Sequence, residues 1–279
     1  MGSASMHRGH KPNVEDLHTS LDIIENLIEL VYLSESRGKK LEGKTPKRGQ
    51  KKMTAPADPK PMGNLYRYFT AEAALHTIEN RNLRIGRLKE MNDAFEWRPA
   101  IEGLVDTQQA GEVSEQCIEN WINEQHSKHG FISFSEIADE PLLWAHYADK
   151  HSGICLEFKA DNFEDTVCID YKSPRPLLDM NKLNDEAHTL PFLKRLFKTK
   201  SKNWEYEREV RSLLPLENRD TNKGSYFIPI PDGALKRVIL GYRCPQEESY
   251  IESALKKAGF DASVTRARLC HTEYKVLSD

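Results

Sequence analysis

Residues 131–158 read FISFSEIADEPLLWAHYADKHSGICLEF, and this stretch predicts the fold class. Phe131–Ser135 alternates apolar and polar side chains as a strand does, Pro141–Ala148 is typical of a short helix, and Gly153–Phe158 favours a second strand. The segments on either side also mix short strands with helices, without a regular βαβ alternation or an internal repeat. We therefore expect an α+β fold with a mixed, mostly antiparallel sheet and flanking helices.

The neighbouring segments supply the remaining expected elements. Leu65–Phe69 predicts a strand, and Thr70 is placed to cap a helix that runs to Glu79. A strand that enters after Trp204 and continues through 210–214 is also expected. The other expected elements are strands at 83–85, 167–171, 237–241 and 274–277 and helices over 112–126, 181–200 and 246–259.

The length of 279 residues predicts one folded domain of about 200 to 220 residues plus an appendage. Residues 1–13 resemble a tag or a disordered start, and residues 14–36 carry apolar side chains at helical spacing. Residues 37–63 have few large apolar side chains and predict a basic, flexible linker. Residues 64–279 are then expected to form a single domain.

The formal charge of −3 conceals an uneven distribution along the chain. Residues 37–62 hold nine basic and two acidic side chains, a net charge of +7, so the rest of the chain carries −10. This stretch could be a solvated tether or an arm that contacts RNA or DNA phosphates. A second basic run at 194–202 could also contact nucleic acid, and the helix over 14–36 could bind a protein partner.

The cysteine pattern and the hydropathy of the chain indicate its cellular location. Its five cysteines are odd in number and scattered without CxxC spacing, so we expect neither a disulfide framework nor a bound metal. No apolar run approaches the roughly 20 residues of a membrane span, and we see no signal peptide. We therefore expect a cytoplasmic chain that is not inserted in a membrane.

Polar residues in three of the expected strands are the candidates for chemistry. Glu205, Glu207 and Glu209 alternate along an expected extended segment, so they should share one face. That face is either solvated or holds a cation, a sugar hydroxyl or a developing positive charge. The two serines of Phe131–Ser135 either satisfy each other or bind a ribose, and Arg67 either pairs with an acid or binds a phosphate.

The run Leu143–Phe158 resembles the WxHYAxxHxGxCxxF signature of the bacterial domain of unknown function family 2971. The resemblance spans about residues 64–277, although Ala94 stands where the family usually has Pro. It implies an accessory bacterial gene, such as a toxin or a phage-defence effector. Further segments that resemble the family are Leu65–Tyr68, Met91–Glu96, Phe131–Ser135, Lys202–Arg211 and Val238–Gly241.

The order of Arg67, Ser133-Phe-Ser135 and Glu207-Arg-Glu209 is also similar to the Arg-Ser-Glu class of ADP-ribosyltransferases. That resemblance implies NAD as substrate. It implies that Glu209 stabilises the charge that develops at C1′ and that Glu207 orients or deprotonates the acceptor.

The same resemblance implies further binding residues. Arg67 would hold a phosphate or a ribose, and Ser133 or Ser135 would fix the ribose next to nicotinamide. Trp144 or Tyr147 would stack on a ring, and His146 is either an acid–base group or a structural hydrogen-bonding residue.

Two other functions stay open at this point. The chain could be a nucleic-acid-binding protein or a metal-dependent nuclease, with Asp93, Glu96 and the two glutamates at 207 and 209 as magnesium ligands. It could also be a non-catalytic interaction module. The polar loop formed by Asn92, Asp93 and Glu96 either caps the helix after it or borders the pocket.

Overall fold

The computed structural model describes residues 61, 63–101, 119–120, 123, 127–163, 166–178, 186–216, 221–222 and 224–278. The expected start at 1–13, the helix over 14–36, almost all of the linker and most of the helix over 112–126 lie outside these ranges. Within the described ranges, no helix combines the length and the apolar character that a membrane crossing requires.

The described residues fall into two compact units. The smaller unit comprises the described parts of 97–125 and 175–197, and the larger unit comprises the rest. In the smaller unit β3 (Ala100–Ile101) pairs in parallel with β8 (Leu177–Leu178), and most of α6 (Glu186–Lys198) belongs to it. Trp97 packs edge-on against Phe197, with ring centroids 4.1 Å apart. The single domain over 64–279 stays a prediction.

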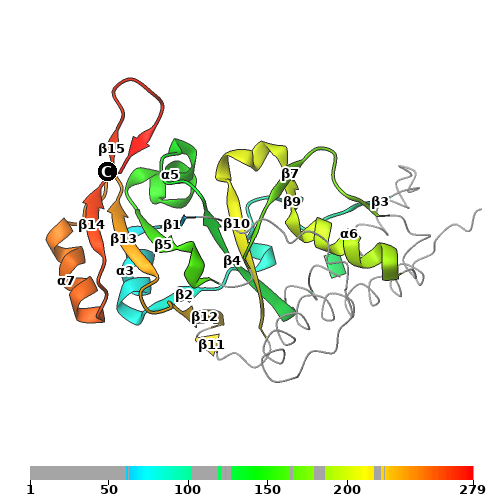
Figure 1. The fold of residues 1–279 in the computed structure, drawn as a ribbon, viewed down its shortest axis with the longest axis horizontal. Helices are drawn as coiled ribbons and strands as arrows, with labels where there is room; N and C mark the ends of the chain where they lie inside the picture. The colour runs from blue at the N-terminus through cyan, green and yellow to red at the C-terminus, as the bar shows by residue number, and fades with distance from the viewer. Residues whose placement is uncertain are drawn as a thin grey trace, which may run out of the picture. The chain divides into compact units, whose positions relative to one another are not determined.

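A seven-stranded sheet forms the centre of the larger unit, in the order β14-β13-β5-β1-β4-β10-β6 (Figure 1). Its neighbouring strands are antiparallel except for β13 and β14, which are parallel. The expected α+β fold with a mixed, mostly antiparallel sheet is therefore confirmed. The strands are β1 (Asn64–Phe69), β4 (His129–Ser135), β5 (Ile154–Lys159), β6 (Thr166–Cys168), β10 (Glu209–Pro215), β13 (Leu235–Leu240) and β14 (Ser263–Arg266).

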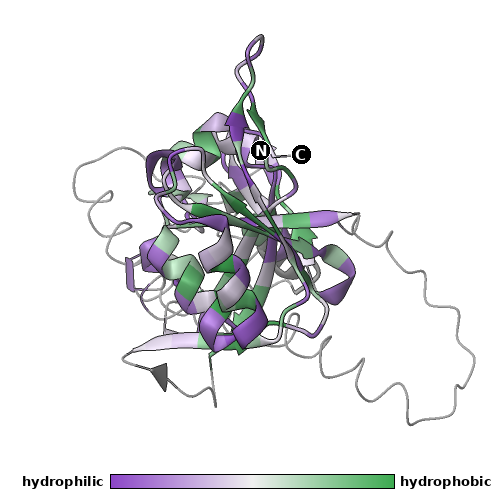
Figure 2. Cartoon of the chain, turned by 90° about the vertical axis from the view of Figure 1, so that its left-hand side faces the viewer, coloured by the Kyte–Doolittle hydropathy of each residue, from purple (hydrophilic) through white to green (hydrophobic). Residues whose placement is uncertain are grey.

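Helices cover both faces of this sheet. The helices α3 (Ala71–Asn80) and α7 (Glu248–Ala258) pack together over the larger core, into which Ile78 and Leu156 are buried. Figure 2 views the unit from this side and shows apolar and polar residues mixed along the exposed ribbons. Thr70 Oγ1 accepts a hydrogen bond from the Ala73 amide at 3.2 Å, which confirms the predicted cap.

The helix α5 (Pro141–Tyr147) packs against the opposite face. Its N-terminus is capped by Glu140, whose carboxylate accepts a hydrogen bond from the Leu142 amide at 3.0 Å. Trp144 is completely buried, and its ring meets Tyr68 edge-on with centroids 5.2 Å apart. This contact fixes α5 against β1 because a buried aromatic pair loses its packing energy if either ring moves.

Shorter elements complete the larger unit. The strand β2 pairs with β12, β12 pairs with β11, and β7 pairs in parallel with β9. The strand expected at 167–171 is divided between β6 and β7. Their bounds are β2 (Asn82–Arg84), β7 (Asp170–Lys172), β9 (Thr199–Ser201), β11 (Thr221–Asn222), β12 (Ser225–Pro229), β15 (Arg268–Leu269) and β16 (Val276–Leu277). The short helices are η2 (Leu88–Glu90), η3 (Asp149–His151), η4 (Ala160–Asn162) and η6 (Lys202–Glu207).

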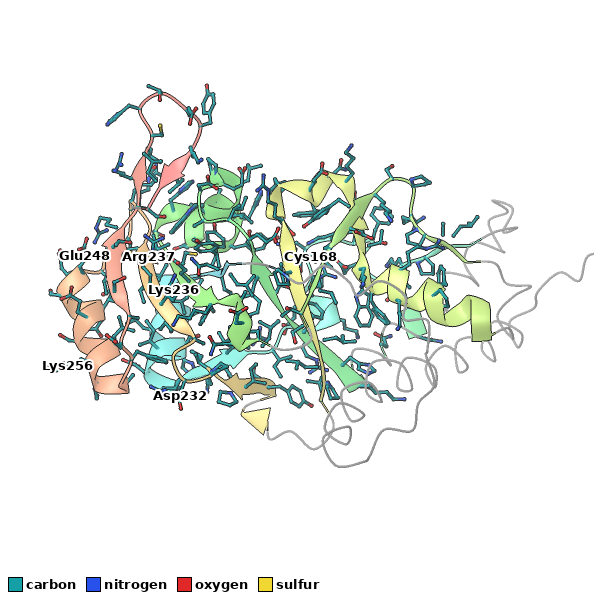
Figure 3. The ribbon with its side chains drawn as sticks, in the orientation of Figure 1. Cys168, Asp232, Lys236, Arg237, Glu248 and Lys256 are labelled. Carbon is teal, nitrogen blue, oxygen red and sulfur yellow. The ribbon has the colours of Figure 1, made fainter. Side chains whose placement is uncertain are left out.

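The buried carboxylate of Glu157 connects strands of the sheet. Glu157 of β5 is 3% exposed and accepts a hydrogen bond from Arg237 Nε at 2.6 Å and from Asn64 Nδ2 at 2.7 Å. Lys236 Nζ lies 3.6 Å from the same carboxylate. Figure 3 labels Lys236 and Arg237 on β13. Because Glu157 of β5 binds the Asn64 amide of β1 and is neutralised by cations of β13, it joins three strands of the sheet.

The segment of the three glutamates differs from the prediction. Lys202–Glu207 forms the short helix η6, and Arg208 has a φ of 42°, so the extended chain begins only at Glu209. Glu205 is exposed, whereas Glu207 and Glu209 are buried. The prediction that these three carboxylates share one strand face is therefore wrong, because the helical turn breaks the alternation.

Candidate functional site

A cavity opens where the sheet is divided. The strands β4 and β10 pair along their whole length, but β1 meets β4 at one position, where Tyr66 lies opposite Ser135. Farther along β4, Phe131 pairs instead with Gly86, through backbone hydrogen bonds of 2.8 and 3.0 Å. A cavity of about 440 Å³ lies between these two pairs and is lined by residues of β1 and β4.

The cavity collects most of the residues that the sequence singled out. Its charged side chains come from β1, β2, β9 and β10, from the turn before β10 and from the segment around η2, so segments far apart in the sequence meet there. Of the predicted site residues, those that line it are Arg67, Ser133, Ser135, His146, Tyr147, Glu207 and Glu209.

Glu209 is the most constrained carboxylate of the cavity. Its Oε1 accepts hydrogen bonds from Ser133 Oγ and Arg211 Nε, both at 2.6 Å. Its Oε2 accepts from Arg211 Nη2 at 2.8 Å and from Lys200 Nζ at 2.9 Å. Burial raises the pKa of Glu209, but the charges of Arg211 and Lys200 outweigh burial and lower it to about 2. The group is therefore ionised at neutral pH.

Glu207 shares Lys200 with Glu209 but has a different environment. Its Oε1 accepts a hydrogen bond from the Tyr147 hydroxyl at 2.6 Å, and its Oε2 accepts from Lys200 Nζ at 2.5 Å. Ser135 Oγ donates to the Glu207 backbone carbonyl at 2.6 Å, which fixes the turn. Burial raises the pKa of Glu207, and Lys200 only partly offsets this. A carboxylate with a raised pKa is suited to proton transfer near neutral pH.

Lys200 lines the cavity but was not among the site residues predicted from the sequence. It was assigned to the basic run at 194–202, but its side chain is 5% exposed and pairs with Glu207 and Glu209. The buried Lys200 side chain is therefore not exposed for contact with nucleic acid, and contact through the rest of the run at 194–202 stays a prediction. No local pattern distinguishes Lys200 from the exposed Lys202, because its burial depends on the pairing of β9 with the distant β7.

Arg211 connects the site to the loop at 92–96. It donates to Glu96 through Nη1 at 2.6 Å and Nη2 at 3.0 Å, and both side chains are buried. Asp93 Oδ1 accepts a hydrogen bond from the Phe95 amide at 2.9 Å and so caps the turn that follows it, while Asn92 lines the cavity. The loop therefore both caps a turn and borders the site.

Three of the four acids proposed as magnesium ligands, all except Asp93, are paired with cations of the protein. Lys200 lies between Glu207 and Glu209, and Arg211 lies between Glu209 and Glu96. In the part of the chain that the structure describes, no group of three or more side chains is arranged to hold a metal ion. Cations of the protein thus occupy the positions that a magnesium ion would need.

Arg67 offers a positive charge for which the described residues provide no ion-pair partner. Its Nη2 donates to the Arg84 carbonyl at 2.8 Å, whereas its Nη1 is buried and has no hydrogen-bond partner among the described residues. Burial and the nearby charge of Arg84 lower the pKa of Arg67 to about 10, so it remains a cation. A buried guanidinium nitrogen without a partner at a cavity wall is suited to bind an anion.

The aromatic candidates separate into one core residue and two wall residues. Trp144 donates from Nε1 to the Ala138 carbonyl at 2.7 Å and does not line the cavity. The prediction that Trp144 stacks on a bound ring is corrected, because its burial leaves no ring face for a ligand. Tyr147 and the exposed His146 do line the cavity.

Comparison of the chain with protein-family models, with curated proteins and with solved structures finds no match.

Proposed function

We propose that the chain is an ADP-ribosyltransferase-like enzyme that consumes NAD and modifies a protein or nucleic-acid acceptor. One observation carries the proposal: Arg67, Ser133 and Glu209 come from β1, β4 and β10, which are neighbours in the sheet, and line one cavity. Their order in the sequence and their position around the cavity match the three-part site that the transferase resemblance implies.

The residues present fit a nucleotide substrate. A volume of about 440 Å³ lies within the range of roughly 300 to 1,000 Å³ that is usual for small-molecule sites. The unpaired Nη1 of Arg67 suits a phosphate oxygen, and the hydroxyl of Ser133 suits a ribose hydroxyl. NAD, when bound, would supply a nicotinamide–ribose bond that breaks with the electron pair leaving on nicotinamide.

Glu209 and Glu207 have the protonation properties that this reaction needs. Glu209 stays ionised, so it can accept a hydrogen bond from a ribose hydroxyl and stabilise positive charge at C1′. Glu207 has a raised pKa, so it can take the proton that the acceptor loses when it bonds to C1′. Different environments assign different roles to the two carboxylates.

The test measures nicotinamide released from NAD by the purified full chain, with radiolabelled transfer to proteins, DNA and RNA. Glu209→Gln should lower the rate by about 100-fold or more, because a preorganised electrostatic group is lost. Glu205→Gln is the matched control, since Glu205 is exposed on the adjacent turn, and it should keep the wild-type rate. Circular dichroism and melting curves establish that each variant is folded.

Failure of the wild-type protein to release nicotinamide with every acceptor would contradict the proposal. Cleavage of nucleic acid that needs a divalent metal and stops with a chelator would support the nuclease alternative instead. Capture of a partner without either activity, abolished by removal of residues 1–62, would support the interaction module.

We also propose the finer assignments that accompany this function. The resemblance to family 2971 supports a role as a bacterial toxin or phage-defence effector. Cys155, Cys244 and Cys270 are free thiols, which supports a reducing location such as the cytoplasm. Contacts with nucleic acid through 37–62, or with a protein through 14–36, stay predictions because these segments lie outside the described residues, residue 61 apart.

A further inference from the structure

Lys200 occupies the centre of the site, and the proposed function does not assign it a role. Its ammonium group donates to Glu207 and Glu209, and its third side faces the Trp204 ring at 5.1 Å. The side chain is 5% exposed, so water screens neither ion pair strongly. Burial lowers the pKa of Lys200, but the charges of Glu209 and Glu207 outweigh burial and leave the pKa above its ordinary value. Lys200 therefore stays charged.

The hydrogen bonds of Glu209 leave no room for a substrate hydroxyl in this arrangement. A carboxylate accepts about four hydrogen bonds, and Ser133, Lys200 and the two donors of Arg211 occupy these positions. A ligand hydroxyl can therefore bind the Glu209 carboxylate only where one of these donors leaves.

The three donors differ in how readily they can leave. Arg211 does not line the cavity and is also held by Glu96. Ser133 lines the cavity, but its hydroxyl would lose its carboxylate partner by leaving Glu209. Lys200 also lines the cavity and retains its ion pair with Glu207 when it leaves Glu209. Lys200 is thus the donor whose departure leaves the fewest groups unpaired.

We propose that Lys200 is a positioning residue that keeps the Glu207 and Glu209 carboxylates ionised and close together in the free site. We propose further that it gives its place on Glu209 Oε2 to a ligand hydroxyl. The second step rests on the proposed function, whereas the first step concerns only the two carboxylates.

The proposal has a measurable consequence for Glu207. Its pKa is raised by burial and by Glu209 and lowered by Lys200, so removal of Lys200 should raise it further. A lysine whose charge did not act on Glu207 would leave this titration unchanged. The other ionisable groups around Glu207 are Tyr147 from α5, Tyr171 from β7 and Tyr206 from its own turn.

The experiment follows the carboxyl signals of labelled glutamate by NMR while the pH changes, with Glu207 assigned from Glu207→Gln. In Lys200→Met the midpoint of Glu207 should rise by about one pH unit or more. Lys200→Arg keeps the charge and should stay close to the wild-type midpoint. Lys172→Met removes an exposed lysine of β7 and should also leave it unchanged.

An unchanged Glu207 midpoint in folded Lys200→Met would overturn the first step. If that variant does not fold, the first step is tested by NMR on the wild-type protein with labelled lysine. The Lys200 ammonium signal, assigned from Lys200→Arg, must then shift with the same midpoint as Glu207. A Lys200 ammonium signal that does not shift as Glu207 titrates would also overturn the first step.

The second step is tested with ADP-ribose as the probe. Its addition to the wild-type protein should shift the Lys200 ammonium signal, because the ion pair with Glu209 opens. Binding of ADP-ribose without such a shift would overturn the exchange alone. Absence of ADP-ribose binding, together with no release of nicotinamide, would sink the exchange and the proposed function, while the glutamate titration still decides the first step.

Discussion

Tyr66 lies opposite Ser135, and among the described residues this pair is the only register position that joins β1 to β4. The strands on either side are paired fully, so the sheet is continuous at this point and open beyond it. The opening brings Arg67 of β1 and Ser133 of β4 to the same cavity as Glu209. The position of the site thus follows from incomplete strand pairing.

Arg211→Met should destabilise the protein by about 3 to 5 kcal/mol, because it leaves the buried Glu96 and Glu209 without their main cation. Urea denaturation measures the free energy of unfolding. Arg208→Met is the control, since Arg208 is exposed beside the same strand and should have little effect. Equal stability of the two variants would show that the buried network does not hold the fold.

The contribution of Glu209 to stability should depend on pH. Its folded-state pKa of about 2 lies below the ordinary value, so ionised Glu209 stabilises the fold at neutral pH. This stabilisation, on the order of 3 kcal/mol, is lost as the pH falls from about 5 to about 2. Glu209→Gln should therefore flatten the acid side of a plot of unfolding free energy against pH.

Glu205→Gln is again the control for this pH dependence, because its carboxylate is exposed. It should retain the steep acid side of the wild-type protein. A wild-type slope in Glu209→Gln would mean that other groups account for acid unfolding.

Arg67→Met should separate ligand binding from stability. Among the described residues Arg67 Nη1 has no hydrogen-bond partner and Nη2 has one, so removal of the side chain should change the free energy of unfolding by no more than about 1 kcal/mol. Affinity for ADP-ribose, measured by calorimetry, should fall about ten-fold or more, because a charge-assisted hydrogen bond is lost. Arg243→Met, which removes an exposed arginine outside the cavity, should change neither quantity. Unaltered affinity in Arg67→Met would exclude Arg67 as the anion-binding group.

Gly153→Ala should destabilise the start of β5. A Cβ at this position would overlap the Phe69 carbonyl and the Ala148 backbone, neither of which can move without disturbing β1 or α5. We expect a cost of roughly 3 kcal/mol in the unfolding free energy. Gly86→Ala provides a graded comparison, because its nearest neighbour would lie at 3.3 Å. A smaller loss for Gly153→Ala than for Gly86→Ala would contradict this account.

Much of the local structure could be predicted from short-range patterns. Thr70 caps α3 as expected because a side-chain oxygen at that position meets an unpaired helix amide. The strands β1, β4 and β5 and the helix α5 also lie where alternation and composition predicted them. These features depend on neighbours within a few residues, which the sequence displays directly.

Other predictions failed where distant contacts decide the outcome. Alternation predicted one face for Glu205, Glu207 and Glu209, but a helical turn and the positive φ of Arg208 divide them. Composition placed Lys200 in a basic run that could contact nucleic acid, but its side chain is buried and paired with two carboxylates. Trp144 was expected to stack on a bound ring, but its side chain is buried in the core against Tyr68.

The sequence by itself determined the α+β class and the order in which Arg67, Ser133 and Glu209 occur, because period-two patterns and residue types are local properties. The tertiary structure alone decided that these residues share a cavity and that Lys200 joins them. The reason is physical: Lys200 is buried where Glu207 and Glu209 neutralise its charge, and the approach of these residues is set by strand pairing between distant segments.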